Sequence, residues 1–78
     1  MVPTILRQDG FDFFFYANKH RPRHVHVKKG YNFGRIDLET MIYVSGTFKV
    51  AEERKVMEIA RSNRNSLLEV WDGYFSKR

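Results

Sequence analysis

The apolar residues of this chain repeat with two different periods, and the change falls near Lys49. Before that point apolar and polar residues alternate in short runs bounded by turn residues, which is typical of β-strands. After it, apolar residues recur at helical spacing between charged ones, at Val50, Val56, Met57, Ala60, Leu67, Leu68, Trp71 and Phe75. The pattern predicts an α+β fold: a small antiparallel sheet of three or four strands, followed by a C-terminal helix or two helical segments packed on one face.

The β-region divides into a series of short strands that we expect to pair in sequence order as a meander. The expected strands are Val2–Arg7, Phe11–Ala17, Arg23–Lys29 and Tyr31–Leu38, and residues 39–46 hold a less regular candidate. The Asp9-Gly10 pair predicts a tight turn after the first strand. Because Phe11–Ala17 is apolar on both sides, we expect it to be the central strand.

The helical region contains Ser62-Asn63-Arg64-Asn65, a run of weak helix formers that predicts a break or bend. We expect the helical segments to cover one face of the sheet. The expected contacts join Val50, Met57, Ala60, Leu67 and Trp71 to Phe13, Phe15, Val25 and Ile36.

One segment carries all three histidines of the chain, in the run N-K-H-R-P-R-H-V-H-V-K-K-G. In an extended strand His24 and His26 lie on one side while Val25 and Val27 lie on the other. We therefore expect the valines to face the core and the imidazoles to face solvent. Pro22 disfavours helix before the strand, so the preceding histidine, at position 20, is expected in the loop that leads into it.

Positive charge is concentrated around these histidines. Between Asp12 and Asp37 there is no acidic residue, while six of the fourteen Lys and Arg residues lie there. The other eight are balanced by nine acidic residues, so the net charge of +5 comes from this segment. Such a block favours contact with phosphates or with acidic protein surfaces.

The length of 78 residues predicts a single domain, residues 1–78, with a thin core. At this size folding buries roughly 60 to 65% of the surface of the unfolded chain, so self-association as a homodimer or a stable partner is expected. The absence of cysteine and of a leader-like or membrane-spanning run favours a reduced, cytoplasmic location without a membrane.

Residues along nearly the whole chain resemble a known family of small bacterial and phage proteins, domain of unknown function 4160. The residues that carry the resemblance are Pro3, Thr4, Gly10, Phe11, Phe13, Phe15, Tyr16, His20, Pro22, His24, His26, Val27, Leu67, Leu68, Glu69, Trp71 and Phe75. The chain departs from the usual pattern at Lys19 and Arg23, where that pattern has Glu and Pro.

The resemblance implies a partner and a setting. Members of the family often lie beside a second small protein, domain of unknown function 2442, and the pair is commonly treated as a toxin–antitoxin module. It implies a protein partner encoded nearby. Lys19 cannot act as a base or metal ligand in the way that the usual Glu could.

The basic segment supports three functional hypotheses, of which the first is recognition without chemistry or cofactor. Cations would bind the phosphates of a nucleic acid, or an acidic protein partner, while aromatic rings stack on bases. The expected binding residues are His20, Arg21, Arg23, Lys28, Lys29, Arg35 and Tyr16, with Tyr31 and Phe33 nearby.

The second hypothesis is metal-independent RNA cleavage by a toxin. Two imidazoles can divide the base and acid roles near neutral pH, so His24 and His26 are the candidate catalytic residues. Arg23 and Lys28 would stabilise charge on the phosphate, with Tyr16 as a further proton donor.

The third hypothesis is a metal site formed by His20, His24 and His26, with Asp37 or Glu39 as a carboxylate ligand. The surrounding positive charge disfavours a divalent cation there. A purely structural interpretation is also open, in which half-buried histidines bond to neighbours and the cations discourage aberrant strand pairing.

Overall fold

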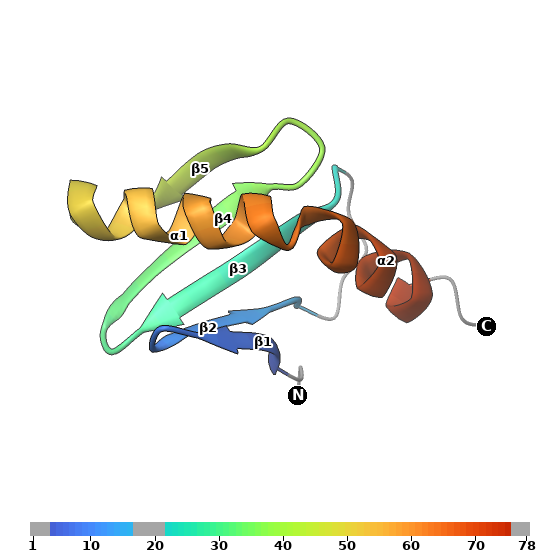
Figure 1. Cartoon of the computed structure of the whole chain (residues 1–78), viewed down its shortest axis with the longest axis horizontal. Helices are drawn as coiled ribbons and strands as arrows, with labels where there is room; N and C mark the ends of the chain where they lie inside the picture. The colour runs from blue at the N-terminus through green and yellow to red at the C-terminus, as the bar shows by residue number, and fades with distance from the viewer. Residues whose placement is uncertain (1–3, 17–21, 76–78) are drawn as a thin grey trace.

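The computed structural model describes residues 4–16 and 22–75, in which five strands are followed by two helices (Figure 1). The strands are β1 (Thr4–Gln8), β2 (Phe11–Phe14), β3 (His24–Lys29), β4 (Asn32–Asp37) and β5 (Ile42–Gly46). The helices are α1 (Val50–Ser62) and α2 (Arg64–Phe75). The predicted α+β class is confirmed, with five strands instead of three or four.

The strands form one antiparallel meander in the order β1-β2-β3-β4-β5. The central strand is therefore β3, and the prediction that Phe11–Ala17 lies at the centre was wrong. Ile42–Gly46 forms a full edge strand, which moves the middle of the sheet to the histidine strand. β2 is also shorter than predicted, because it ends at Phe14.

The turn between β1 and β2 is the one that the sequence predicts. Asp9 and Gly10 have φ values of 54° and 84°, so both central residues lie in the left-handed region. This backbone matches the right-handed twist of a hairpin, and it is why an Asp-Gly pair is favoured there.

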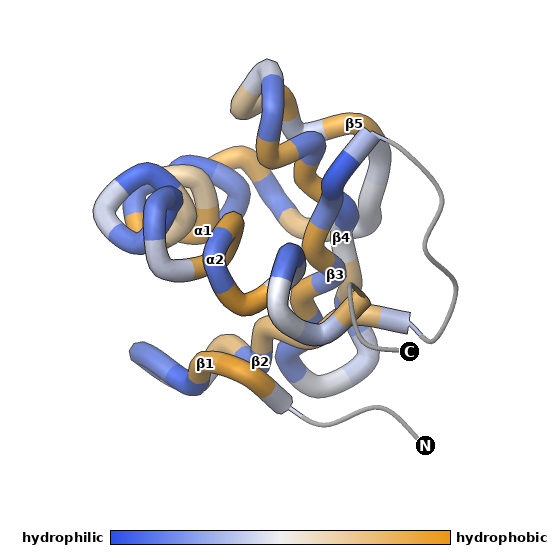
Figure 2. Tube along the Cα trace, turned by 90° about the vertical axis from the view of Figure 1, so that its right-hand side faces the viewer, coloured by the Kyte–Doolittle hydropathy of each residue, from blue (hydrophilic) through white to orange (hydrophobic). Residues whose placement is uncertain are grey.

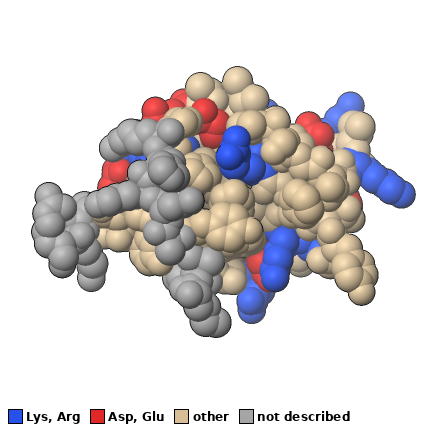
Figure 3. Space-filling view, turned by 180° about the vertical axis from the view of Figure 1, so that it is seen from behind, with Lys and Arg blue, Asp and Glu red and all other residues tan. Residues whose placement is uncertain are grey.

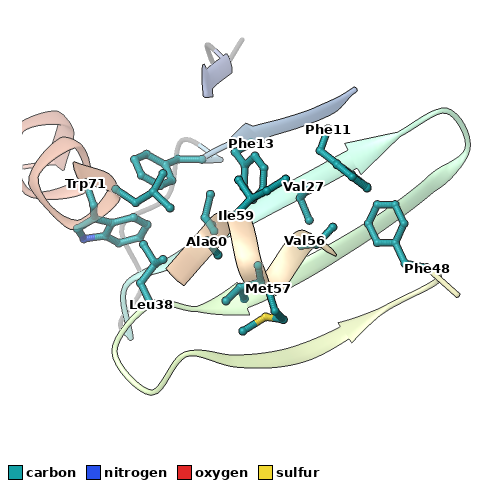
Figure 4. Close-up of a cluster of buried hydrophobic side chains, with 14 residues drawn as sticks. Phe11, Phe13, Val27, Leu38, Phe48, Val56, Met57, Ile59, Ala60 and Trp71 are labelled. Atoms are coloured by element: carbon teal, nitrogen blue, oxygen red, sulfur yellow. The ribbon is translucent and has the colours of Figure 1, made fainter. Parts of the chain in front are cut away.

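The core lies between the sheet and the helices, which cover the same face (Figure 2). Alternation along the strands buries Phe11, Phe13, Phe15, Val25, Val27, Ile36 and Leu38, and the helices add Val56, Met57, Ile59, Ala60, Leu67 and Trp71 (Figure 4). Most of the predicted core is confirmed. Val50 is an exception, because it begins α1 and is 67% exposed.

The predicted break in the helical region falls at Asn63, between α1 and α2. The Asn63 side-chain amide donates a hydrogen bond of 2.8 Å to the carbonyl oxygen of Ile59, while its backbone N–H bonds the carbonyls of Ile59 and Ala60. These bonds satisfy carbonyls that the end of α1 would otherwise leave open. Within the described ranges, neither helix has the length and apolar character needed to cross a membrane.

Candidate functional site

Four side chains from four neighbouring strands form a row across the face of the sheet opposite the helices. Phe14 of β2 pairs with His26 of β3, and His26 pairs with Arg35 of β4. Arg35 in turn pairs with Ser45 of β5. Since the residues on either side of Phe14, His26 and Arg35 are buried on the helix side, alternation places these three side chains on the helix-free face, and Ser45 joins them through its pairing with Arg35.

A pocket of about 240 Å³ lies over the cross-strand row. Its lining adds Tyr16 and Phe33 to the four side chains of the row, and the backbone at Gly34 forms part of it. Three of these lining residues are Phe or Tyr, and His26 adds a fourth ring. We call this feature the aromatic pocket.

The rings of the aromatic pocket contact one another. The ring centroid of His26 lies 4.2 Å from that of Tyr16 in an edge-on arrangement, and 5.7 Å from that of Phe14 with the planes 25° apart. Tyr16 and Phe33 remain 50% and 57% exposed, so the ring surfaces are open to a ligand. An aromatic residue that is half exposed on a sheet offers a flat apolar surface for stacking.

The environment of His26 keeps its imidazole neutral. Burial, followed by the nearby His24 and Arg35, lowers the pKa of His26 to about 4. Burial acts by disfavouring the charged form, and the two neighbours act by electrostatic repulsion. At neutral pH this ring therefore offers one hydrogen-bond donor and one acceptor but no charge.

His24 begins β3 and lies close to α2. Its Nδ1 lies 2.8 Å from the carbonyl oxygen of Pro22, and because that oxygen only accepts, Nδ1 carries the proton. The His24 ring lies 5.1 Å from the ring of Trp71 and 5.2 Å from that of His26. The histidine segment is extended and its valines are buried, as predicted, but both imidazoles are half buried among aromatic rings.

Comparison with models of protein families shows which family the chain belongs to. The model of the family described as Domain of unknown function (DUF4160) matches residues 10–72. The chain belongs to the DUF4160 family. Neither the curated proteins nor the solved structures gave a match to it. The DUF4160 match includes the whole of β2 to β5 and α1, so the cross-strand row lies inside it and β1 lies outside it.

Arg23, a predicted phosphate-binding residue, is engaged within the protein. Its guanidinium lies 3.3 Å from a carboxylate oxygen of Glu39 and 3.0 Å from one of Asp72. Its backbone N–H also donates to Glu39. The side chain thus joins the start of β3 to the turn before β5 and to α2, which is a structural role.

The other predicted cations divide between the two faces of the sheet. Lys29 lies on the helix side, where its Nζ is 4.8 Å from the ring centroid of Phe11 and 3.8 Å from a carboxylate oxygen of Glu52. Lys28 and Arg35 are exposed on the helix-free face, and no carboxylate within residues 4–16 and 22–75 forms an ion pair with either. In Figure 3 this face is mostly uncharged, with a few separate blue Lys and Arg groups and, at the lower centre, two that lie close together beside a red acidic group.

Two predicted binding residues, His20 and Arg21, lie outside the described residues. In the part of the chain that the structure describes, no three His, Cys, Asp or Glu side chains are grouped to hold a metal. Asp37, one predicted carboxylate ligand, accepts hydrogen bonds of 2.8 and 3.1 Å from the backbone of Glu39 and Thr40. The metal hypothesis depends on His20 and stays a prediction.

The sequence analysis did not place Phe14 or Ser45 among the candidate site residues. The alternation of buried and exposed residues in β2 gives the signal for Phe14, because Phe11 and Phe13 take the core side. No comparable signal exists for Ser45. The register between β4 and β5 shifts between Arg35 and Ile36, and this irregularity decides which β5 residue pairs with Arg35.

Proposed function

We propose that this protein binds single-stranded nucleic acid through the helix-free face of its sheet. The observation that carries the proposal is the cross-strand row, in which aromatic rings and a cation share one open pocket. Single strands are commonly held on surfaces that combine stacking platforms with positive charge.

The aromatic residues supply the stacking surface. Phe33 and Tyr16 are each at least half exposed, and they line the aromatic pocket together with Phe14 and His26. Stacking of one base on an aromatic side chain contributes about 1–3 kcal/mol and tolerates any base. We expect two such platforms, together with the neighbouring cations, to hold a short strand.

Lys28 and Arg35 supply the charge. On the helix-free face Lys28 pairs in register with Phe33, so a cation stands beside the more exposed ring. Arg7 lies on the neighbouring strand pair, but its Nε is 2.8 Å from a carboxylate oxygen of Asp12. Among the described residues neither Lys28 nor Arg35 forms an ion pair, although Lys28 also pairs in register with Asp12. We therefore expect both cations to contact a bound strand, whose phosphate backbone is negatively charged.

Fluorescence anisotropy with labelled single-stranded and duplex RNA tests the proposal. We expect the single strand to bind more tightly, and Phe33→Ala to weaken binding about 5- to 100-fold. Lys28→Ala should weaken binding and reduce the slope of log K against log salt by about 0.7. Arg54→Ala on α1 removes the same charge from the opposite side of the molecule and should leave affinity within about twofold.

The same samples separate recognition from cleavage. If His24 and His26 form an acid–base pair, RNA is cleaved without added metal, and the His24→Ala, His26→Ala double variant abolishes that cleavage. A neutral His26 at pH 7 cannot donate a proton as an imidazolium, so we expect binding without cleavage. Equal affinity of wild type and Phe33→Ala for RNA would contradict the proposed surface.

We further propose that the protein acts as one component of a toxin–antitoxin pair, as its family resemblance implies. Co-expression with the protein encoded beside it tests this proposal. We expect the two proteins to copurify and one of them to arrest growth when it is expressed alone. Separate elution and normal growth with either protein would contradict the pairing.

A further inference from the structure

We propose that the aromatic pocket receives one base of the bound strand and that Arg35 selects guanine by its O6 and N7 atoms. This inference rests on the proposed function and adds base specificity to it. Stacking alone is indifferent to base identity, so any selection must come from hydrogen bonds at the edge of a stacked base.

The aromatic pocket has the size and walls for a single base. Its volume is about 240 Å³, with Tyr16 and Phe33 in its lining. The His26 ring, a member of the cross-strand row, lies 4.2 Å from the Tyr16 ring and is stacked on Phe14. A planar ring placed against these side chains would meet apolar surface on its faces and polar groups only at its edge.

Arg35 is the charged member of this lining. In the described ranges, the guanidinium groups of Arg7 and Arg23 are held by carboxylates, whereas none forms an ion pair with Arg35. A guanidinium presents five N–H donors in a planar fork and has no acceptor. To bond both arms of this fork, a base in the aromatic pocket must present two hydrogen-bond acceptors side by side.

Guanine meets this requirement on its Hoogsteen edge. Its O6 and N7 are adjacent acceptors that an arginine fork contacts in a bidentate manner. Adenine places an N6 donor beside N7, so it sets a donor against the fork. Cytosine presents an N4 donor on the corresponding edge, while its O2 and N3 are adjacent acceptors on the Watson–Crick edge. A strand with a central cytidine tests that alternative and should bind no more tightly than the all-uridine strand. Uracil has O4, the counterpart of the thymine acceptor, without an adjacent N7.

The neighbours of Arg35 in the row are compatible with this assignment. His26 is neutral at pH 7 and has an acceptor as well as a donor, and Ser45 has a hydroxyl that can do either. Neither side chain competes for the fork as a carboxylate would. Lys28 lies two residues along β3 from His26, where it remains available to a phosphate.

The test compares strands of about nine uridines that carry one guanosine, adenosine, inosine or 7-deazaguanosine at the centre. Anisotropy should show the guanosine strand binding roughly 10-fold more tightly than the all-uridine strand. Inosine keeps O6 and N7 and should retain the preference. The 7-deazaguanosine strand lacks N7 and should lose most of it, and adenosine should show none.

Two variants test whether Arg35 causes the preference for the guanosine strand. Arg35→Lys keeps the charge but not the fork, so the ratio between the guanosine and all-uridine strands should fall to about one. Lys28→Ala should weaken both strands by the same factor and leave the ratio unchanged. The emission of Trp71, which is 3% exposed and the only tryptophan, verifies that each variant is folded.

The outcomes separate this inference from the proposed function. If every strand binds equally and Arg35→Lys changes no ratio, Arg35 contacts phosphate and the guanine assignment is wrong, while single-strand binding stands. If no strand binds, both proposals are wrong.

Discussion

His26 and Arg35 face each other across β3 and β4 on the helix-free side of the sheet. Burial, followed by the proximity of His24 and of the Arg35 guanidinium, lowers the pKa of His26 to about 4. A neutral imidazole beside the exposed Arg35 guanidinium, within a group of aromatic rings, suits the recognition of a base. The same pairing also makes the stability of the fold depend on pH.

The first prediction concerns that dependence. Unfolded protein binds a proton at His26 near pH 6.5, whereas folded protein does so only near 4. Between these values the unfolded state binds more protons, so the free energy of unfolding falls as the pH is lowered from about 6.5 to 4. The full difference would be about 3 kcal/mol, and solvent screening of a half-buried ring reduces it to about 1–2 kcal/mol.

Urea denaturation across this pH range measures the effect, with His26→Gln as the variant that lacks the titrating ring. The wild type should lose more stability than the variant. An NMR titration that placed the pKa of His26 near 6.5 would contradict the assignment.

The second prediction concerns Arg23, whose guanidinium joins β3 to Asp72 of α2 at 3.0 Å. Arg23→Met keeps much of the aliphatic packing and removes the ion pairs, so we expect a lower Tm and faster hydrogen exchange in α2. Combined with Asp72→Asn, the loss should be less than additive. Arg54→Met on α1 is the matched control and should change Tm little. Strict additivity of Arg23→Met and Asp72→Asn would show that the two residues do not interact.

The third prediction concerns the close approach of Gly34 to Tyr43. A Cβ at Gly34 would lie 2.7 Å from Cε1 of Tyr43 and 2.9 Å from its hydroxyl oxygen, so the ring would have to move. Gly34→Ala should destabilise the protein by about 1–3 kcal/mol. Gly73→Ala in α2 meets no atom within 4 Å and should be neutral or stabilising by up to about 1 kcal/mol. Thermal denaturation of both variants measures this, and equal stabilities would contradict the packing at Tyr43.

The parts of the fold that follow from local patterns could be predicted from the sequence. The Asp9-Gly10 turn, the alternation in the histidine strand and the break at Asn63 each depend on neighbouring residues, and all three are present. The position of β2 depends on how many strands form after it. β5 begins after Met41, which adopts a φ of 58° that is uncommon for a residue other than glycine. Because Met41 is not a typical turn residue, the start of this strand had only a weak signal in the sequence.

The candidate site was also predicted only in part, because local patterns show some of its features and others depend on contacts between distant residues. Alternation placed His24 and His26 opposite the valines, but no local pattern could show that Arg23 binds a carboxylate 49 residues away. Likewise, Ser45 joins the cross-strand row only through the irregular register of β5. Contacts between residues far apart in the sequence, rather than spacing along the chain, decide which Lys and Arg side chains are held in ion pairs within the protein.

The central claim is that the helix-free face of the sheet binds single-stranded nucleic acid. A two-dimensional ¹H–¹⁵N NMR titration of the wild-type protein with a short single-stranded RNA tests it most directly. We predict that the largest shifts fall at Phe14, Tyr16, His26, Phe33, Arg35 and Ser45, with α1 little changed. Shifts concentrated on α1, or no shifts at saturating RNA, would contradict it.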